Sequence, residues 1–237
     1  HSAIFQSLQG RADNQIHRIL LTASGGPFRG KKRADLEQMT LEDALKHPNW
    51  SMGKKVTIDS ASLVNKGLEV MEAKWLFDVS LDQIQVVVHP QSIVHSLVEY
   101  ADGTMLAQMA LPDMKYAIGY ALSYPERLPA FDARLDLTKI KPLEFFRYDK
   151  KNFPAVDIVR EAYSLSPLMP TVLNAANDTA VGAFLQNRIG FSDICETVRK
   201  TLDYYKNRLN GIQLSIDTVY GLDDEAKRTA ENFLKGK

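Results

Sequence analysis

The sequence predicts an α/β domain with a mixed sheet and helices, followed by an extended linker and a C-terminal all-α helical bundle. Three observations support this prediction. Short apolar runs typical of buried strands alternate with helical patterns in residues 1–123. Prolines are frequent in residues 124–155, and the apolar period is helical over residues 156–237. We therefore expect three parts with these boundaries.

The composition fits a folded protein and excludes several classes of partner. The chain has 237 residues, 45% of them hydrophobic, which is enough to bury a sizeable core. Lysine plus arginine and aspartate plus glutamate are balanced at 29 each, so overall charge indicates no nucleic-acid or membrane partner. Cys195 is the only cysteine, which excludes a disulfide within the chain and a cysteine-rich zinc site. We expect a reducing compartment and a local small-molecule pocket.

The chain shows no membrane or export signal. No apolar run approaches the roughly 20 residues that a membrane-spanning helix needs, and no charged leader precedes an apolar segment. We therefore expect a soluble protein. Because the chain opens with His1 rather than methionine, we interpret it as a fragment.

Local signals place the elements of the first part. Residues 19–28, ILLTASGGPF, predict a buried strand that runs into a glycine turn. Thr40 is typical of the N-cap of a short helix in MTLEDALKH. Asp59 or Ser60 is the expected cap of a helix over about residues 61–78.

A strand and a hairpin complete the first part, and helices follow the linker. QVVVHP predicts a strand, and Asp102-Gly103 between SIVHSLVEY and TMLAQMAL predicts a hairpin turn. Four prolines favour an extended linker: Pro125, Pro129, Pro142 and Pro154. Four amphipathic or buried helices are expected in DIVREAYSL, TVLNAANDTAVGAFLQNR, FSDICETVRKTLDYYKNRL and DDEAKRTAENFLKG.

The helix expected after Ser60 carries an unusual polar stripe. At about 100° per residue, four polar positions fall on one face, with Lys66 beside them: Ser62, Asn65, Glu69 and Glu72. The rest of the circumference is apolar, so the helix is expected to be well buried. An amide, an ammonium and two carboxylates suit an anion and a divalent metal. The alternative is a solvated stripe on an ordinary amphipathic helix.

The other candidate residues each have a structural and a functional interpretation. The turn after Ser24 is either a phosphate cradle or only a tight turn, and the Trp50 loop is either a lid or a packing plug. His89 and His95 are interpreted as structural residues rather than metal ligands. The remaining polar or reactive residues are expected to cap or pack helices or to lie in the core: Asn174, Asn177, Asp178 and Cys195.

Five segments occur in the order found in a known family: HSAIFQ, LTASGGPFR, HPNWSMGKKVTIDSASLVNKGLEVMEAKWLF, HPQSIVHS and LNAAND. Through them the chain resembles the 1-deoxy-D-xylulose 5-phosphate reductoisomerase family over essentially its whole length. The resemblance implies an NADP-dependent oxidoreductase and isomerase of non-mevalonate isoprene biosynthesis, with NADPH and Mg²⁺ or Mn²⁺ as cofactors. The carbon skeleton of the phosphosugar would rearrange before reduction to 2-C-methyl-D-erythritol 4-phosphate. Residues 1–123 would be the catalytic domain.

The resemblance also implies roles for individual residues. His47 and Glu69 would be catalytic, Glu69 would be the metal ligand, and Gly53 would bind the nucleotide. Glu72 would be a supporting carboxylate. The implied substrate-binding residues are Ser24, His47, Trp50, Met52, Ser60, Asn65, Lys66 and Glu69.

The chain departs from the family pattern at its start. The family's N-terminal nucleotide-binding domain and an Asp-Ser-Glu triplet that completes the metal site do not occur in it, and it has no G-x-G-x-x-G after a strand. We therefore expect the fragment itself to be inactive. A phosphosugar-binding or dimerisation module, and a metal-dependent isomerase that needs no nucleotide, are the alternatives. The resemblance further implies a homodimer in a bacterial cytoplasm or a plastid stroma.

Overall fold

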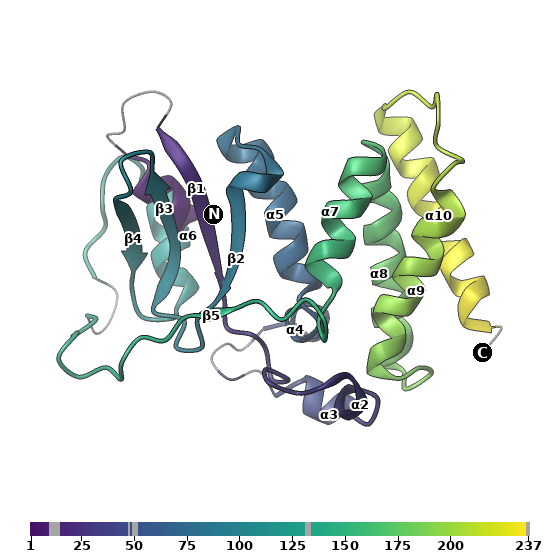
Figure 1. Ribbon diagram of the computed structural model, residues 1–237, viewed down its shortest axis with the longest axis horizontal. Coiled ribbons are helices and arrows are strands. Elements are labelled where there is room, and N and C mark those ends of the chain that lie inside the picture. Colours follow the sequence, from purple (N-terminus) through teal and green to yellow (C-terminus); the bar gives the residue numbers. More distant parts are fainter. Residues whose placement is uncertain (10–14, 47, 49–51, 131–133, 236–237) are drawn as a thin grey trace. The chain divides into compact units, whose positions relative to one another are not determined.

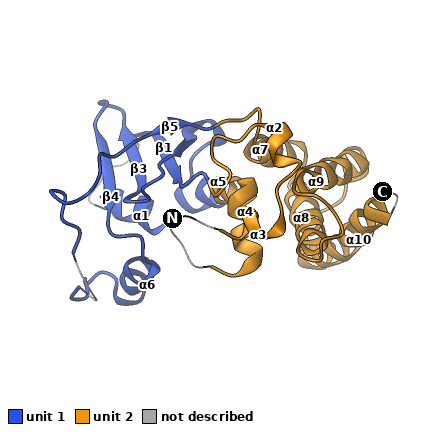
Figure 2. Ribbon diagram, turned by 90° about the horizontal axis from the view of Figure 1, so that it is seen from below, with its two compact units in different colours: residues 1–25, 48–51, 72–148 blue, residues 26–47, 52–71, 149–237 orange. Residues whose placement is uncertain are grey.

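The computed structural model describes residues 1–9, 15–46, 48, 52–130 and 134–235. Their contacts form two compact units that interleave along the chain (Figure 2). Unit 1 contains residues 1–25, 48–51 and 72–148, and unit 2 contains residues 26–47, 52–71 and 149–237. The two units group residues by their contacts and not by their order in the sequence. The domain boundaries expected at residues 123 and 155 stay a prediction.

Unit 1 is built on a five-stranded mixed sheet (Figure 1). Its strands lie in the order β4-β3-β1-β2-β5. β1 pairs with β2 in parallel, whereas the other neighbouring strands pair antiparallel. The strands are β1 (Ile16–Ala23), β2 (Ile84–Val88), β3 (Val94–Tyr100), β4 (Met105–Met109) and β5 (Phe146–Arg147). The predicted mixed sheet is confirmed.

The strands form where the apolar pattern predicted them. β1 lies between β2 and β3, and Ile19 and Leu21 are buried in it. The predicted hairpin joins β3 to β4. Its turn is stabilised by Asp102 Oδ1, which accepts hydrogen bonds from the backbone N–H and hydroxyl of Thr104, and Gly103 takes a φ of 84°.

Three helical segments accompany this sheet: α1 (Ser2–Ser7), the 3₁₀ turn η1 (Leu81–Gln83) and α6 (Met114–Ser123). α1 packs against β3 and β4, where the Tyr100 hydroxyl donates to the Ser7 carbonyl at 2.7 Å. α6 was not predicted from the sequence. It begins after Asp113, whose carboxylate accepts from the backbone N–H of Lys115 at 2.8 Å.

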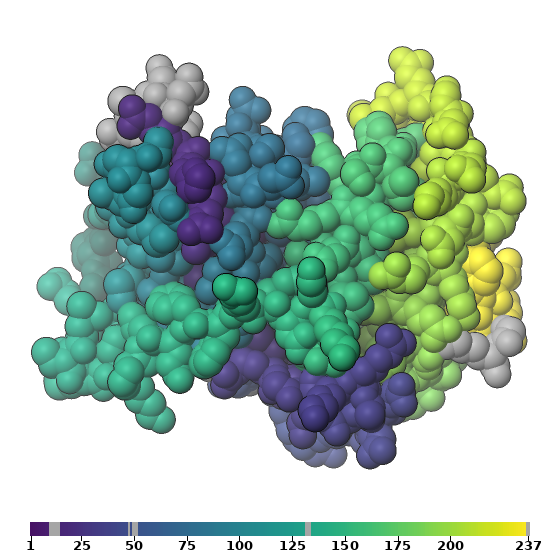
Figure 3. All heavy atoms as spheres, viewed as in Figure 1, coloured from purple at the N-terminus to yellow at the C-terminus, as the bar shows by residue number. Residues whose placement is uncertain are grey.

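The segment after α6 runs over the surface of unit 1 (Figure 3). None of its described residues between 124 and 148 is buried. The segment nevertheless adds a strand to the sheet, because β5 pairs with β2 at Val87 and Val88. The expected linker therefore also forms one edge of the sheet.

Unit 2 is helical. Its helices are α2 (Arg33–Leu36), α3 (Leu41–Ala44), α4 (Lys54–Ser62), α7 (Ala155–Leu165), α8 (Met169–Leu185), α9 (Phe191–Tyr205) and α10 (Ile216–Lys235). The last four lie side by side (Figure 1) around a core that includes Leu168, Met169 and Leu173. The predicted C-terminal helical region is confirmed, although α10 begins at Ile216 rather than at residue 223. No described helix combines the length and apolar character needed to cross a membrane.

The helix expected over residues 61–78 is in fact two helices. Gly53 caps α4, and its carbonyl accepts from the N–H and hydroxyl of Thr57, both at 3.0 Å. The prediction that Asp59 or Ser60 caps the helix is therefore wrong, because both lie inside α4. Leu63, buried and with a φ of 63°, separates α4 from α5 (Val64–Phe77). This break also removes Ser62 from the polar stripe on α5.

The predictions for short local features were more accurate. Thr40 caps α3, and its hydroxyl accepts from the Asp43 N–H at 3.2 Å. Cys195 packs against the helical core, where burial raises the pKa of its thiol to about 11. Cys195 is thus partly buried at the edge of this core.

Candidate active site

Three polar side chains meet on the first two turns of α5. Glu69 Oε1 accepts from the Asn65 amide at 2.7 Å, and Glu69 Oε2 pairs with Lys66 Nζ at 2.6 Å. The Lys66 and Glu69 side chains are only 14% and 26% exposed. The helical spacing of residues 65, 66 and 69 thus yields a compact, half-buried polar cluster whose side chains bond to one another.

This cluster can bind both an anion and a cation. The Lys66 ammonium has three N–H bonds, one of which points to Glu69, and the Asn65 amide has a second N–H besides the one it donates. Such donors suit phosphate oxygens. Glu69 supplies hard carboxylate oxygens, and Mg²⁺ is often held by one or two carboxylates together with water and substrate oxygens. Among the described residues, no group of three or more metal-ligating side chains occurs, so Glu69 fits as one ligand of such an ion.

The glycine turn packs against α4 beside Ser60. Gly26 has a φ of 65°, and a Cβ atom there would lie 2.9 Å from the Ser60 carbonyl and 3.0 Å from Ala61 Cα. Only glycine therefore suits both the backbone angle and the space. Ser60 itself is half-buried near the end of α4. The close approach gives the turn a packing role, and its role in binding phosphate stays a prediction.

The remaining predicted residues are distributed over both units. Ser24 lies in unit 1, just after β1, and the cluster on α5 lies in unit 2. Met52 is half-buried, and Gly53 is exposed with no described atom within 4 Å of the position of an added Cβ. This open space is what a nucleotide near Gly53 would need. His47 and Trp50 lie outside the described residues, so their roles, including the lid, stay predictions.

Glu72 has a partner that sequence reasoning missed. Its carboxylate pairs with His1 Nε2 at 2.5 Å within unit 1. The two residues are 71 positions apart, and no local pattern indicates such a pair. Glu72 therefore contacts a histidine, and its role as a supporting carboxylate of a metal site stays a prediction.

The two histidines near β3 are held by neighbours on the sheet. His89 Nδ1 donates to the Glu144 carbonyl at 2.8 Å, and its Nε2 accepts from the Ile93 N–H at 3.1 Å. Both ring nitrogens are thus engaged by the backbone, as a structural residue requires. His95 Nδ1 lies 3.0 Å from Gln108 Oε1, and burial lowers the pKa of His95 despite this hydrogen bond.

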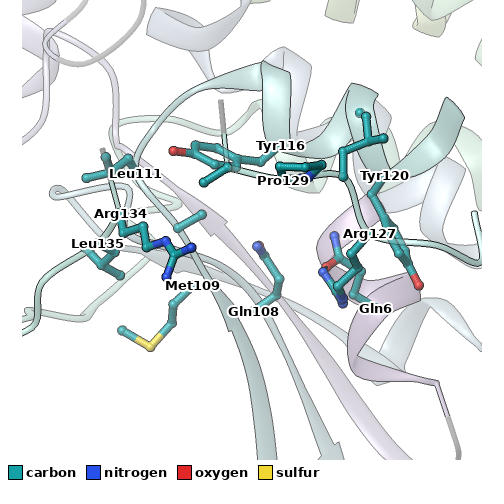
Figure 4. A pocket seen from close by; sticks show the side chains of 14 residues that line it. Gln6, Gln108, Met109, Leu111, Tyr116, Tyr120, Arg127, Pro129, Arg134 and Leu135 are labelled. Carbon is teal, nitrogen blue, oxygen red and sulfur yellow. The ribbon is translucent and has the colours of Figure 1, made fainter. Parts of the chain in front are cut away.

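A cavity of about 270 Å³ lies in unit 1 and includes none of the predicted site residues. It lies between β4, α6 and the segment that follows α6 (Figure 4). Arg127 reaches Gln6 Oε1 at 3.0 Å and stacks over Tyr120, with 4.6 Å between the guanidinium carbon and the ring centre. These contacts hold Arg127 against unit 1, and no residue of the cluster on α5 lines the cavity.

The mixed sheet, the helical unit and the half-buried polar cluster define an α/β protein with a site suited to an anionic ligand and a divalent cation. Two family models match the chain: 1-deoxy-D-xylulose 5-phosphate reductoisomerase C-terminal domain over residues 1–77, and DXP reductoisomerase C-terminal domain over residues 109–229. The chain belongs to the 1-deoxy-D-xylulose 5-phosphate reductoisomerase family.

Curated relatives and solved structures agree with this assignment. The chain is 51% identical to the reductoisomerase of Geotalea daltonii over 99% of its own length and 60% of the relative. It is 56% identical to that of Heliobacterium modesticaldum over 87% of its length and 52% of the relative. The chain thus spans about 60% or less of these relatives.

Two solved structures show the same fold. The Zymomonas mobilis reductoisomerase in complex with NADPH superposes with a TM-score of 0.91 at 41% identity, covering 100% of this chain and 60% of that one. A DOX-P reductoisomerase in complex with NADPH, fosmidomycin and magnesium gives a TM-score of 0.91 at 40% identity, covering 99% and 62%. The predicted family and fold class are confirmed.

Proposed function

We propose that this chain is the substrate- and metal-binding part of an enzyme that converts 1-deoxy-D-xylulose 5-phosphate to 2-C-methyl-D-erythritol 4-phosphate with NADPH. The observation that carries the proposal is the Asn65–Lys66–Glu69 cluster in a chain of the reductoisomerase family. The cluster combines anion donors with a metal-ligating carboxylate, which is the chemistry that a phosphosugar and a divalent ion need.

The chain's own residues would bind and orient the substrate. Lys66 and Asn65 would donate to the phosphate, with Ser24 and Ser60 adding hydroxyl donors. Their hydrogen bonds would fix the reacting carbons relative to Glu69 and so reduce the entropy lost at the transition state. Met52, together with Trp50, would cover the bound substrate and exclude water.

Glu69 and His47 are the proposed catalytic residues. Glu69 would hold Mg²⁺ or Mn²⁺, which when bound supplies a Lewis acid for the substrate's oxygens. The magnesium bound by a solved relative supports this role. Gly53, with open space around it, would let the nicotinamide nucleotide approach the substrate. The NADPH bound by solved relatives supports this assignment.

The first test is NADPH oxidation, followed by absorbance, with 1-deoxy-D-xylulose 5-phosphate and Mn²⁺. We expect turnover by an upstream-extended chain and none by the 237-residue chain, in which Glu69 is the proposed metal ligand. If neither chain turns over substrate, a phosphosugar-binding or dimerisation module becomes the better interpretation. If the short chain isomerises substrate without NADPH, it is a nucleotide-independent isomerase.

We further propose that the enzyme is a homodimer formed through unit 1. β4 is an edge strand of the sheet, and an edge presents unpaired backbone groups. α6 exposes an apolar stripe at four-residue spacing: Met114, Ile118 and Leu122, the last 83% exposed. A second copy of this unit presents the same edge and stripe, as a two-fold contact requires.

The proposed compartment is the bacterial cytoplasm, with a plastid stroma as the alternative. The bacterial origin of the curated relatives supports the first. Fractionation of the native cell, followed by immunodetection of the protein, would separate these from a membrane or exported location.

A further inference from the structure

A charged network lies between α4 and α8 in unit 2, apart from the cluster on α5. Asp59, only 2% exposed, accepts at Oδ1 from the Asn177 amide at 2.8 Å and pairs at Oδ2 with Lys55 Nζ at 2.8 Å. Asn177 is fully buried. Lys55 also pairs with Asp178 at 3.0 Å. The network therefore connects two helices whose residues are 118 positions apart.

The network fixes geometry more than it adds stability. A buried carboxylate is costly to desolvate, and an ion pair with good hydrogen bonds roughly offsets that penalty, whereas apolar side chains of similar size would often do as well. Because each Asp59 oxygen has its own partner, the carboxylate has one orientation. The hydrogen bond between Asp59 and Asn177 thereby fixes the position of α4 relative to α8.

A chain of hydrogen bonds leads from Asp59 to the candidate site. Ser62 Oγ donates to the Asp59 carbonyl at 3.2 Å, and the Val64 N–H donates to Ser62 Oγ at 3.4 Å. These bonds cross the break at Leu63 and reach the residue that precedes Asn65. On the other side, Asp59 is bonded directly to Ser60, whose carbonyl is in close contact with the glycine turn at Gly26.

We propose that Asp59, held by Asn177 and Lys55, is a positioning residue that sets Ser60 and Asn65 for binding the substrate's phosphate. The proposal rests on the proposed function, because it assigns the network to that site. Asp59 need not touch the substrate. It acts through the backbone of α4 and through the Ser62 hydrogen bonds at the start of α5.

Steady-state kinetics of the upstream-extended enzyme test the proposal. We expect Asn177→Ser and Asp59→Asn to raise KM for 1-deoxy-D-xylulose 5-phosphate about tenfold and to leave kcat within about twofold, as lost ground-state contacts do. The double exchange Asp59→Asn/Asn177→Asp restores an amide–carboxylate pair with reversed roles. We expect it to bring KM most of the way back to the wild-type value. The matched control is Asp223→Asn, which breaks the Lys227 pair on α10 and should leave both constants unchanged.

Hydrogen–deuterium exchange on the 237-residue chain gives a readout that does not depend on activity. We expect the single exchanges to speed amide exchange over residues 60–66 and to leave α9 unchanged, and the double exchange to reverse this effect. A lower unfolding temperature with unchanged KM and unchanged exchange at residues 60–66 would overturn the proposal. An inactive wild-type enzyme would refute the proposed function. In that case, exchange at residues 60–66 alone decides whether Asp59 orders this segment.

Discussion

At the scale of single residues, Glu69 shows how a local pattern produces chemistry. Its two oxygens have different partners, the Asn65 amide and the Lys66 ammonium, both from the same two helical turns. The Lys66 ammonium balances the negative charge of this carboxylate, whose oxygens are the ligands that a hard divalent cation prefers. The cluster also orients Lys66. This long side chain would therefore lose less rotamer freedom on binding phosphate.

Removing the Glu69 charge should therefore impair turnover more than it impairs folding. For Glu69→Gln in the upstream-extended enzyme, we expect kcat/KM to fall by at least about 100-fold, with a higher Mg²⁺ or Mn²⁺ concentration needed for half-maximal activity. Metal titrations of NADPH oxidation measure both effects. Glu196→Gln, which breaks an exposed i,i+4 pair with Lys200, is the matched control and should show neither. Wild-type metal dependence in Glu69→Gln would remove Glu69 from the metal site.

His95 should make unit 1 sensitive to acid. Burial lowers the pKa of His95 below the usual value, so the unfolded chain binds the proton more readily than the folded one. The stability from neutral His95 is complete above about pH 6.5 and is lost as pH falls through the lowered pKa. Between about pH 7.5 and about pH 5.5, the urea midpoint of His95→Gln should fall less than that of the wild type. His17→Gln, at an exposed position of the same unit, is the control and should keep the wild-type fall.

At the scale of elements, α5 is positioned by a close contact with α7. A Cβ atom on Gly67 would lie 2.5 Å from Val159 Cγ2, so the helices approach where one of them has no side chain. Gly67 is within two residues of Asn65, Lys66 and Glu69, so the contact fixes this part of α5, and with it the cluster, relative to α7. In an otherwise regular helix, the glycine is explained by this packing.

Gly67→Ala should destabilise the chain although alanine favours helix. The added methyl overlaps a buried valine, and such overpacking costs about 1–3 kcal/mol, more than the roughly 1 kcal/mol gained in helix propensity. Urea unfolding measures the net loss, and Gly67→Ala/Val159→Ala should recover part of it by making space. Gly182→Ala on α8, where no described atom lies within 4 Å of an added Cβ, should stabilise instead. A stability gain in Gly67→Ala would contradict the close contact.

Elements with strong local signals were predicted, and those decided by packing were not. The hairpin, the Thr40 cap and the helices α7, α8 and α9 follow from turn chemistry and apolar period. The break at Leu63 did not, because leucine gives no sign of a left-handed backbone. The helical spacing predicted a polar stripe, of which Asn65, Lys66 and Glu69 meet. The pairs Asp59–Asn177 and His1–Glu72 depend on residues far apart in sequence.

At the scale of the whole molecule, both units are assembled from several stretches of chain. Residue 123 lies inside a stretch of unit 1, and residue 155 lies inside a stretch of unit 2. A domain boundary at either position would therefore separate residues that belong to the same unit. Unit 1 carries the exposed stripe on α6 and the edge strand β4, and unit 2 carries other exposed apolar residues, such as Tyr220 on α10. Among the described residues, a sheet edge and an apolar helix face occur together in unit 1.

Leu122→Glu should therefore weaken the proposed dimer. A two-fold contact would bury the introduced charge twice, which should cost about 3 kcal/mol or more and raise the dimer dissociation constant by at least about 100-fold. Sedimentation velocity over a range of concentrations measures the change. Tyr220→Glu introduces the same charge at an exposed position of unit 2 and should leave assembly unchanged. The opposite pattern would place the dimer surface on α10.

The pairing of Asp59 with Asn177 also has a consequence for the newly made protein. The two residues are 118 positions apart, so at about 5–20 residues per second the ribosome needs roughly 6–24 seconds to supply the amide after the carboxylate. During that interval α4 has no α8 against which to pack. Nascent chains that end before Asn177 should therefore leave residues 54–71 open to proteases and chaperones, and longer ones should protect them.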